Sequence, residues 1–257
     1  MTTLAAAVAT RLPARWVGSA ACALYPRFEP ELGRLADFCP RGGTAVDVGG
    51  WYGPCSRRLA ARCDRVVTLE PVPHLAGHLK QTLPRHAQVL QAAATDRDGT
   101  AQLWLPEGDR GDRGLSSLAR RDIHSHSVDV RTLTLDSLDL HDVGFVKVDV
   151  DGSELPALQG AAALLERERP ALLIELETRI RPIAPTVGLL TGQGYRGWVL
   201  RTRTWVPLTR FDLAGHQSRT EHLVHQGLFR RALVPRGRRY INSVLFLPDG
   251  RAPAAAG

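Results

Sequence analysis

The stretch Thr44-Ala-Val-Asp-Val-Gly-Gly-Trp-Tyr-Gly53 decides the fold of this chain. It begins as a short apolar strand, continues as a glycine turn and leads into a helix that starts near Pro54. A glycine turn that opens a helix offers unpaired backbone N–H groups, so it suits a small cofactor. The stretch therefore predicts a cofactor-binding strand, turn and helix. The alternative is the same local structure without a ligand.

The acid inside this stretch indicates which cofactor fits. Dinucleotide-binding turns have the spacing G-x-G-x-x-G, whereas the glycines here are Gly49, Gly50 and Gly53. Asp47 lies at the end of the strand, where its charge would repel a pyrophosphate. A carboxylate suits a cationic ligand instead, such as S-adenosylmethionine with its ammonium and sulfonium. A nicotinamide-dependent oxidoreductase is therefore the less favoured reading.

A second short apolar strand, Val66-Val-Thr-Leu-Glu70, also ends in an acid. The residues between the two strands can form a helix over 54–63 and a right-handed crossover. The carboxyl ends of neighbouring parallel strands border one crevice, so Glu70 is predicted to hold the ribose hydroxyls. A third strand is expected over 88–94. The turn after it places Asp96 to reach the adenine amino group, although an Asp there is also ordinary turn chemistry.

The length of 257 residues and the 44% hydrophobic content fit a single domain. We divide it into a helical extension (1–42), a cofactor-binding core (43–180), and a substrate cap with the last strand (181–257). The extension is expected to form amphipathic helices within 1–26 and around 29–39.

No run of about 20 apolar residues is present, so no membrane span is expected. The four cysteines lack the spacing of a metal site, which is typical of reduced thiols in a cytoplasmic protein. They are Cys22, Cys39, Cys55 and Cys63.

A further strand, Phe145–Val150, carries charges where a buried parallel strand is normally apolar. The chain has 31 arginines and only two lysines, and one of these, Lys147, lies here with Asp149. Buried charges are costly unless they are paired, and Glu175 and Glu177 on the next strand are the expected partners. Lys147, Asp149 and Glu175 are the candidate catalytic residues. For Lys147 a structural ion pair is the alternative.

Several motifs, taken in order, resemble the FkbM-type methyltransferases. They are Val46-Asp-Val-Gly-Gly-Trp-Tyr-Gly53, Leu69-Glu-Pro-Val-Pro73, Thr132-Leu-Thr-Leu-Asp-Ser-Leu138, Val146-Lys-Val-Asp-Val-Asp-Gly-Ser-Glu-Leu155, Leu158-Gln-Gly-Ala161 and Arg169-Pro-Ala-Leu-Leu-Ile-Glu175. The resemblance covers about 44–177, with a weaker echo in 242–247. Two positions depart from the family pattern: Gly50-Trp51 replaces the usual Ala-Asn, and Asp151 replaces the usual Glu.

The resemblance implies an α/β fold of the class I methyltransferase (Rossmann-like) kind. Such a fold has a doubly wound sheet, mostly parallel with an antiparallel last strand. The implied activity is S-adenosylmethionine-dependent O-methylation of a sugar or natural-product hydroxyl. Asp149 would act as the base, or with Glu175 as a ligand of a divalent cation such as Mg²⁺. His124, His126 and His216 are alternative bases; the first two lie in or beside a long polar loop over 106–126.

The basic charge of the chain is concentrated near its C-terminus. Residues 196–240 contain ten arginines and two acids, and tryptophans are interleaved with them. We expect this segment to cap the cleft, with Trp198 and Trp205 against a small-molecule or oligosaccharide acceptor. The alternatives are a solvated face or a homo-oligomer interface anchored by arginine. His222 and His225 lack a third ligand in register, so no metal site is expected there.

Two other classes of function are less well supported. The pI of about 9.8 suits a nucleic-acid methyltransferase, but Asp149-Val-Asp-Gly152 stands where such enzymes carry an Asn/Asp-Pro-Pro-Tyr/Phe motif. No nucleic-acid partner is therefore expected. A non-catalytic saccharide-binding protein would not need Asp47 and Glu70 together. A sugar hydroxyl, a lipid carboxylate and a polyketide hydroxyl all remain open as the acceptor.

Overall fold

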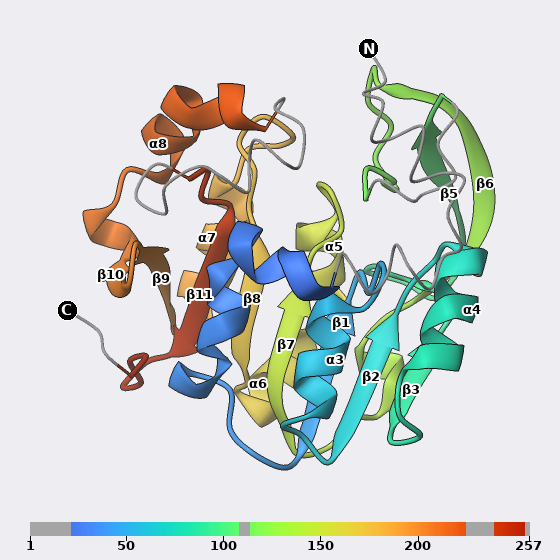
Figure 1. Ribbon diagram of the computed structural model, residues 1–257, viewed down its shortest axis with the longest axis horizontal. Helices are drawn as coiled ribbons and strands as arrows, with labels where there is room; N and C mark the ends of the chain where they lie inside the picture. The colour runs from blue at the N-terminus through green and yellow to red at the C-terminus, as the bar shows by residue number, and fades with distance from the viewer. Residues whose placement is uncertain (1–21, 108–113, 225–238, 255–257) are drawn as a thin grey trace.

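The computed structural model describes residues 22–107, 114–224 and 239–254. Its centre is an eight-stranded sheet with the order β10-β9-β11-β8-β7-β1-β2-β3 (Figure 1). Five neighbouring strands are parallel: β1 (Thr44–Val48), β2 (Arg65–Leu69), β3 (Ala87–Leu90), β7 (Val143–Val148) and β8 (Ala171–Glu175). The other three make the antiparallel end: β11 (Ser243–Pro248), β9 (Tyr195–Arg201) and β10 (Thr204–Pro207). The predicted mostly parallel sheet with an antiparallel last strand is confirmed.

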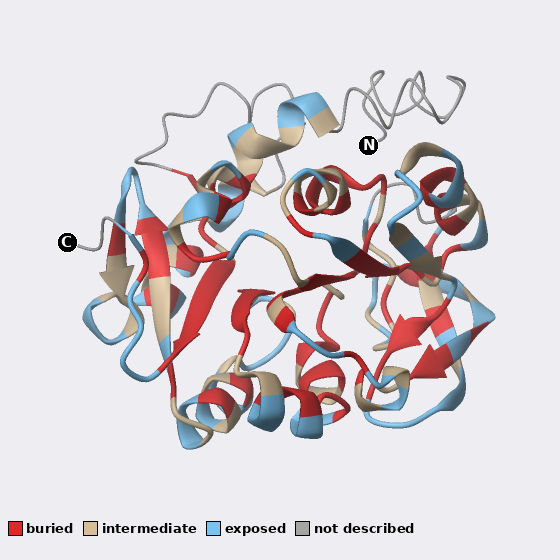
Figure 2. Ribbon diagram, turned by 90° about the horizontal axis from the view of Figure 1, so that it is seen from below, coloured by how far each residue is buried: buried red, intermediate tan, exposed pale blue. Residues whose placement is uncertain are grey.

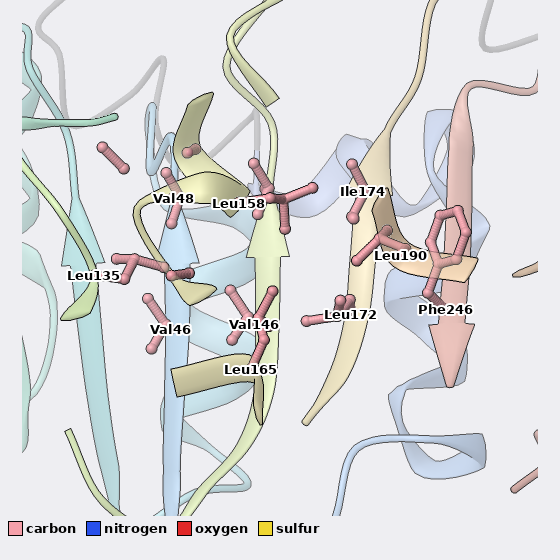
Figure 3. Packing of buried hydrophobic residues seen from close by; sticks show 14 of the residues in the cluster. Val46, Val48, Leu135, Val146, Leu158, Leu165, Leu172, Ile174, Leu190 and Phe246 are labelled. Carbon is pink, nitrogen blue, oxygen red and sulfur yellow. The ribbon is translucent and has the colours of Figure 1, made fainter. Parts of the chain in front are cut away.

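Helices cover both faces of this sheet (Figure 2), which explains why its strands are apolar on both sides. On one face, valines of β1 and β7 pack against α5 (Glu154–Gln159), α6 (Ala162–Glu168) and α7 (Ala184–Gly192) (Figure 3). On the other face, Phe145 and Leu173 pack against η1 (Pro30–Asp37) and α3 (Pro54–Ala60). α4 (Pro73–Thr82) connects β2 to β3. The sheet is doubly wound, as predicted.

A second, three-stranded sheet has the order β4-β6-β5. β5 (Gly99–Pro106) and β6 (His124–Leu133) form an antiparallel hairpin, and β4 (Ala93–Ala94) runs parallel to β6. The single strand predicted over 88–94 is therefore wrong in its extent. Its first half is β3 of the main sheet and its last two residues are β4 of the small sheet. The periodicity could not show this break, because both halves are equally short and apolar.

The described part of the N-terminal extension contains a short helix over 22–28, and η1 follows it. The predicted helix over 29–39 is a 3-10 helix with non-helical backbone at Arg34. Most of the helix predicted within 1–26 lies outside the described residues. Among the residues that the structure describes, no helix is long and apolar enough to cross a membrane.

The predicted cap over the C-terminal third is partly a sheet edge. β9 and β10 belong to the main sheet, and Trp205 is completely buried against Phe38 with its ring edge-on at 5.6 Å. The expectation that Trp205 contacts an acceptor is therefore wrong, because the core already covers its indole. α8 (Leu213–Thr220) lies above the sheet in Figure 1, and Gln217 fastens it to the segment after β8. Part of the basic segment, including His225, lies outside the described residues.

Candidate active site

The candidate active site lies where β1 and β7 are neighbours and the chain leaves them toward opposite faces of the sheet. Open α/β sheets bind ligands at the carboxyl ends of the strands at such a switch point. Gly49 has φ +88°, and a Cβ on it would lie 1.9 Å from the carbonyl oxygen of Asp149. The glycine turn therefore packs directly on the loop after β7, and only glycine fits there.

The backbone N–H groups at the start of the turn are not free, contrary to the sequence-based expectation. Gly49 and Gly50 both donate to the carbonyl of Leu69, at 2.9 and 3.1 Å, and Gly53 donates to Gly50. A Cβ on Gly50 would lie 2.4 Å from the side chain of Thr68, so this glycine serves packing against β2. The role of the three glycines in cofactor binding stays a prediction.

Asp47 is buried below the turn rather than exposed in the crevice. Its exposed fraction is 0%, and its Oδ2 accepts a hydrogen bond of 2.5 Å from Ser56 in the first turn of α3. In the strand register it lies between Thr68 and Lys147. Burial raises the pKa of Asp47 to about 6. Its Oδ1 has no hydrogen-bond partner among the described residues, which leaves one buried acceptor for a ligand or water.

Glu70 follows β2 and is 4% exposed. Its Oε2 accepts a hydrogen bond of 2.7 Å from the backbone N–H of Trp51, and its Oε1 accepts one of 2.9 Å from Val72. Burial raises the pKa of Glu70 to about 7, although these two hydrogen bonds favour the carboxylate. Each oxygen keeps a second lone pair, so the group is fixed in place and can still accept from a vicinal diol.

Asp96 lies next to the second sheet, whereas Asp47 and Glu70 lie in or next to the first. It follows β4 in the small sheet, its side chain is 47% exposed, and Thr95 donates to its Oδ1 at 3.0 Å. The adjoining backbone packs on the turn between α5 and α6, where a Cβ on Gly160 would lie 2.0 Å from the Thr95 carbonyl. The adenine-binding role of Asp96 stays a prediction.

Lys147 is the cation of a buried charge cluster on the α3 face of the sheet. It is 3% exposed, and its Nζ lies 2.6 Å from Oδ2 of Asp149 and 3.9 Å from Oε2 of Glu29. Burial lowers the pKa of Lys147, but these carboxylates outweigh burial and raise it well above its ordinary value. The prediction that Glu175 and Glu177 are the partners of Lys147 is therefore wrong. Asp149, two residues further along the chain, and the unforeseen Glu29 hold this charge instead.

Asp149 and Glu175 are hydrogen-bonded to each other at the ends of β7 and β8. Although burial raises the pKa of Asp149, Lys147 and Glu175 hold it below its ordinary value. Burial and the charge of Asp149 raise the pKa of Glu175 well above its ordinary value. Asp149 is therefore the ionised member and Glu175 the protonated one. Asn242 also donates to Glu175.

This pair does not fit the divalent cation that sequence reasoning considered. The ammonium of Lys147 already lies against the Asp149 carboxylate, and the side-chain amide of Asn242 donates to Glu175. Within the described ranges, no group of three or more His, Cys, Asp or Glu side chains is arranged to hold a metal ion. We therefore derive no step through a metal.

The segment 114–124 packs on the loop that follows Asp149. Ser117 donates to the carbonyl of Asp151 at 2.7 Å, and Arg121 forms an ion pair with its side chain at 3.5 Å. His124 accepts from the backbone N–H of Arg121, and its other ring nitrogen lies 3.0 Å from the carbonyl of Leu115. This histidine thus holds the segment together and is a poor candidate for the base.

The other two histidines offer no better base. His126 is exposed and lies beside Ser125, whereas His216 on α8 lies 3.0 Å from the carbonyl of Arg239. Sequence reasoning missed Tyr25 and Glu29, which the extension brings to the cluster. Glu29 is fixed by a hydrogen bond of 2.8 Å from Ser243. No local pattern distinguishes these two residues from those of an ordinary amphipathic helix.

The residues present suit an adenosyl cofactor with a cationic sulfur. The crevice offers a fixed diol acceptor in Glu70 and negative charge in Asp149. Below the glycine turn, Asp47 keeps one carboxylate oxygen without a hydrogen-bond partner among the described residues. The glycine turn brings these strand ends together. The arrangement can hold hydroxyl groups and a cation beside a carboxylate that can accept a proton.

Residues 43–196 match the family described as the Methyltransferase FkbM domain. A comparison with curated proteins gave no match.

Three similar solved structures illustrate the range of the likeness. Methyltransferase FkbM from Methylobacillus flagellatus KT has 15% sequence identity and a TM-score of 0.47; the match covers 90% of this chain and 60% of that one. SMU.1697c from Streptococcus mutans, in complex with SAH, has 10% identity and a TM-score of 0.46 over 86% and 96% of the chains. An rRNA methylase from Streptococcus thermophilus has 10% identity and a TM-score of 0.43 over 85% and 93%.

Proposed function

Because the chain belongs to the FkbM methyltransferase family, we propose that it transfers a methyl group from S-adenosylmethionine to a hydroxyl oxygen of a small molecule. The observation that carries the proposal is the fixed carboxylate of Glu70 on the same edge of the sheet as the ionised Asp149. Glu70 suits the ribose hydroxyls. Asp47 and the glycine turn fix the neighbouring end of β1, through hydrogen bonds to Ser56 and to the carbonyl of Leu69.

When bound, S-adenosylmethionine supplies a methyl group on a sulfonium, which an oxygen nucleophile takes by in-line displacement. The task of the protein is alignment of the acceptor oxygen, and positioning of this kind is worth about 7–11 kcal/mol. In the proposal Asp149 accepts a hydrogen bond from the acceptor hydroxyl and takes its proton. Lys147 and Glu175 keep Asp149 ionised and oriented. A placed base contributes about 10²–10⁴-fold.

A pocket of about 190 Å³ at the carboxyl end of β8 supports a small acceptor. Glu175 lines it and is hydrogen-bonded to Asp149, so the pocket adjoins the proposed base. Glu154, Glu177 and Arg181 also line it, so the lining carries polar groups that can bond a hydroxyl-bearing acceptor. We keep a saccharide hydroxyl as the first acceptor and a natural-product hydroxyl as the second.

The cofactor assignment is tested by calorimetry on Glu70→Ala. Loss of charge-assisted hydrogen bonds to the ribose should weaken S-adenosylmethionine binding by about 1.5–3 kcal/mol. Asp98→Ala, which removes an exposed acid in the turn before β5, is the control and should bind normally. Undiminished affinity in Glu70→Ala would remove Glu70 from the ribose site.

Two competing classes are separated by simple binding measurements. A nicotinamide-dependent oxidoreductase would be stabilised against heat by NAD(P) rather than by S-adenosylmethionine. A nucleic-acid methyltransferase would bind a duplex with a steep dependence on salt. The proposal expects neither result and expects stabilisation by S-adenosylmethionine instead. The four free cysteines suit a reducing compartment, so we propose the cytoplasm as its location.

A further inference from the structure

Trp51 holds an unusual backbone conformation at the centre of the candidate active site. Its φ is +46°, in the left-handed region that bulky side chains rarely adopt. The resemblance described above places Asn at this position, and Asn tolerates the left-handed region well. This chain therefore keeps a strained residue where an unstrained one fits. Such strain is found mainly at sites where function requires it.

The indole of Trp51 lies beside two tyrosine rings and close to a glycine of another segment. Tyr25 of the N-terminal extension lies 5.7 Å from it between ring centroids, and Tyr52 lies 5.0 Å from it. Gly114 of the segment that packs on the β7 loop lies on another side, because a Cβ there would be 3.8 Å from the indole nitrogen. In this setting Trp51 as a whole is half-buried.

These rings lie between the two carboxylates that bracket the crevice. The backbone N–H of Trp51 donates to Glu70, the predicted ribose ligand. Burial and the nearby charges of Asp149 and Glu29 raise the pKa of the Tyr25 phenol well above its ordinary value, so Tyr25 is neutral beside the proposed base. Trp51 therefore lies next to Glu70, and Tyr25 lies near Asp149, the proposed base.

An aromatic face attracts a cation that lies within about 6 Å of the ring centroid, and a neutral group gains no such attraction. We propose that Trp51, with Tyr25, binds the sulfonium of S-adenosylmethionine through its aromatic face. The inference rests on the proposed function and adds two cofactor-binding residues to it. Its consequence is selectivity: the crevice favours the cationic cofactor over S-adenosylhomocysteine, the neutral product, and so assists product release.

The test compares the affinities of cationic and neutral ligands by calorimetry. The ligands are S-adenosylmethionine, sinefungin, whose amine provides a positive charge in place of the sulfonium, and S-adenosylhomocysteine. Trp51→Asn is the main variant, since Asn suits the backbone conformation and favours a folded protein. We expect it to weaken binding of both cationic ligands by about five- to thirty-fold. Binding of S-adenosylhomocysteine should change by less than about two-fold.

Three further variants keep the test decisive. Trp51→Phe retains an aromatic face and should restore most of the selectivity. Tyr25→Leu removes the second ring without touching the glycine turn and should reduce the selectivity in part. Trp198→Ala is the matched control: it removes a half-buried tryptophan from β9, four positions from β1 in the sheet order, and should leave all three affinities unchanged.

An equal loss of affinity for all three ligands in Trp51→Asn would overturn the inference, because stacking on adenine or a purely structural role predicts that result. Unchanged affinities would overturn it as well. If the wild type bound none of the three ligands, the proposed function itself would fail, and this inference with it. Selective loss of the cationic ligands establishes the sulfonium contact.

Discussion

At the scale of single residues, the candidate active site contains a buried lysine whose charge is compensated by nearby carboxyl groups. Lys147 is neutralised by Asp149 and Glu29, while Glu175 carries a proton between its neighbours. A buried ion pair contributes little net stability, but removal of one partner leaves an uncompensated charge. The proposal that this cluster serves chemistry is consistent with its place at the strand ends, where Asp149 keeps 23% of its side chain exposed.

The corresponding prediction concerns Asp149→Asn. Asn is nearly isosteric and still accepts a hydrogen bond, but it cannot take a proton, so kcat should fall by at least about 100-fold. Methyl transfer would be measured with labelled S-adenosylmethionine and an alcohol acceptor selected by screening. Glu29 remains to compensate Lys147, so folding and cofactor affinity should persist. Normal turnover would remove Asp149 from the mechanism, and inactivation of the wild type by a chelator would restore the metal hypothesis.

At the scale of elements, the N-terminal extension is fastened to the far edge of the sheet. The indole of Trp205 on β10 donates to Asp37 at 2.8 Å and packs edge-on against Phe38. Arg34 bonds the carbonyl of Arg203 between β9 and β10 at 3.0 Å. These contacts position the same extension that delivers Tyr25 and Glu29 to the active site. The sheet edge therefore supports the site from a distance.

We expect Trp205→Ala to lower the free energy of unfolding by about 3–5 kcal/mol, since it empties a fully buried site. Trp205→Phe keeps the ring contact and loses the hydrogen bond to Asp37, so its cost should be clearly smaller. Denaturant-induced unfolding measures both. A loss below about 1 kcal/mol in the alanine variant would contradict the buried position and return Trp205 to the solvent-facing cap.

At the scale of the whole molecule, the charge distribution is uneven. The net charge is +7, yet the crevice edge of the sheet gathers buried acids. Burial raises the pKa of four described carboxyl groups to about 6–8: Glu31, Asp47, Glu70 and Asp151. The ordinary pKa values of these groups are 3.8 to 4.5. At a pH between the ordinary and the raised values, the folded protein therefore binds more protons than the unfolded chain.

The free energy of unfolding of the unliganded protein should therefore fall as the pH rises from about 4.5 to about 8. Histidines whose pKa is lowered by burial act in the opposite direction up to pH 6.5, but the described residues contain fewer of them: His78, His124 and His216. Thermal unfolding across this range measures the slope. Glu70→Gln cannot titrate and should show a shallower decline up to pH 7. A stability that rises through this window would contradict the buried carboxyl assignments.

The sequence by itself determined the features that depend on local pattern. Short, mostly apolar runs gave β1, β2, β7 and β8, and the acids at their ends gave the positions of Glu70 and Asp149. The doubly wound sheet was implied by the resemblance of these motifs to one family of methyltransferases, and the strand order confirms it. These features can be predicted from the sequence because a strand, a turn and the start of a helix each depend on residues that are neighbours in the chain.

Only the tertiary structure decided which groups share a proton, which face the crevice and which are covered. Asp47 is buried under Ser56, Trp205 lies in the core, and Glu29 reaches Lys147 from 118 residues away. The sequence also did not show that the strand predicted over 88–94 is divided between two sheets. Each of these outcomes depends on contacts between distant segments. A carboxyl group takes its charge and its exposure from the atoms that surround it in space, and sequence neighbours supply only a few of them.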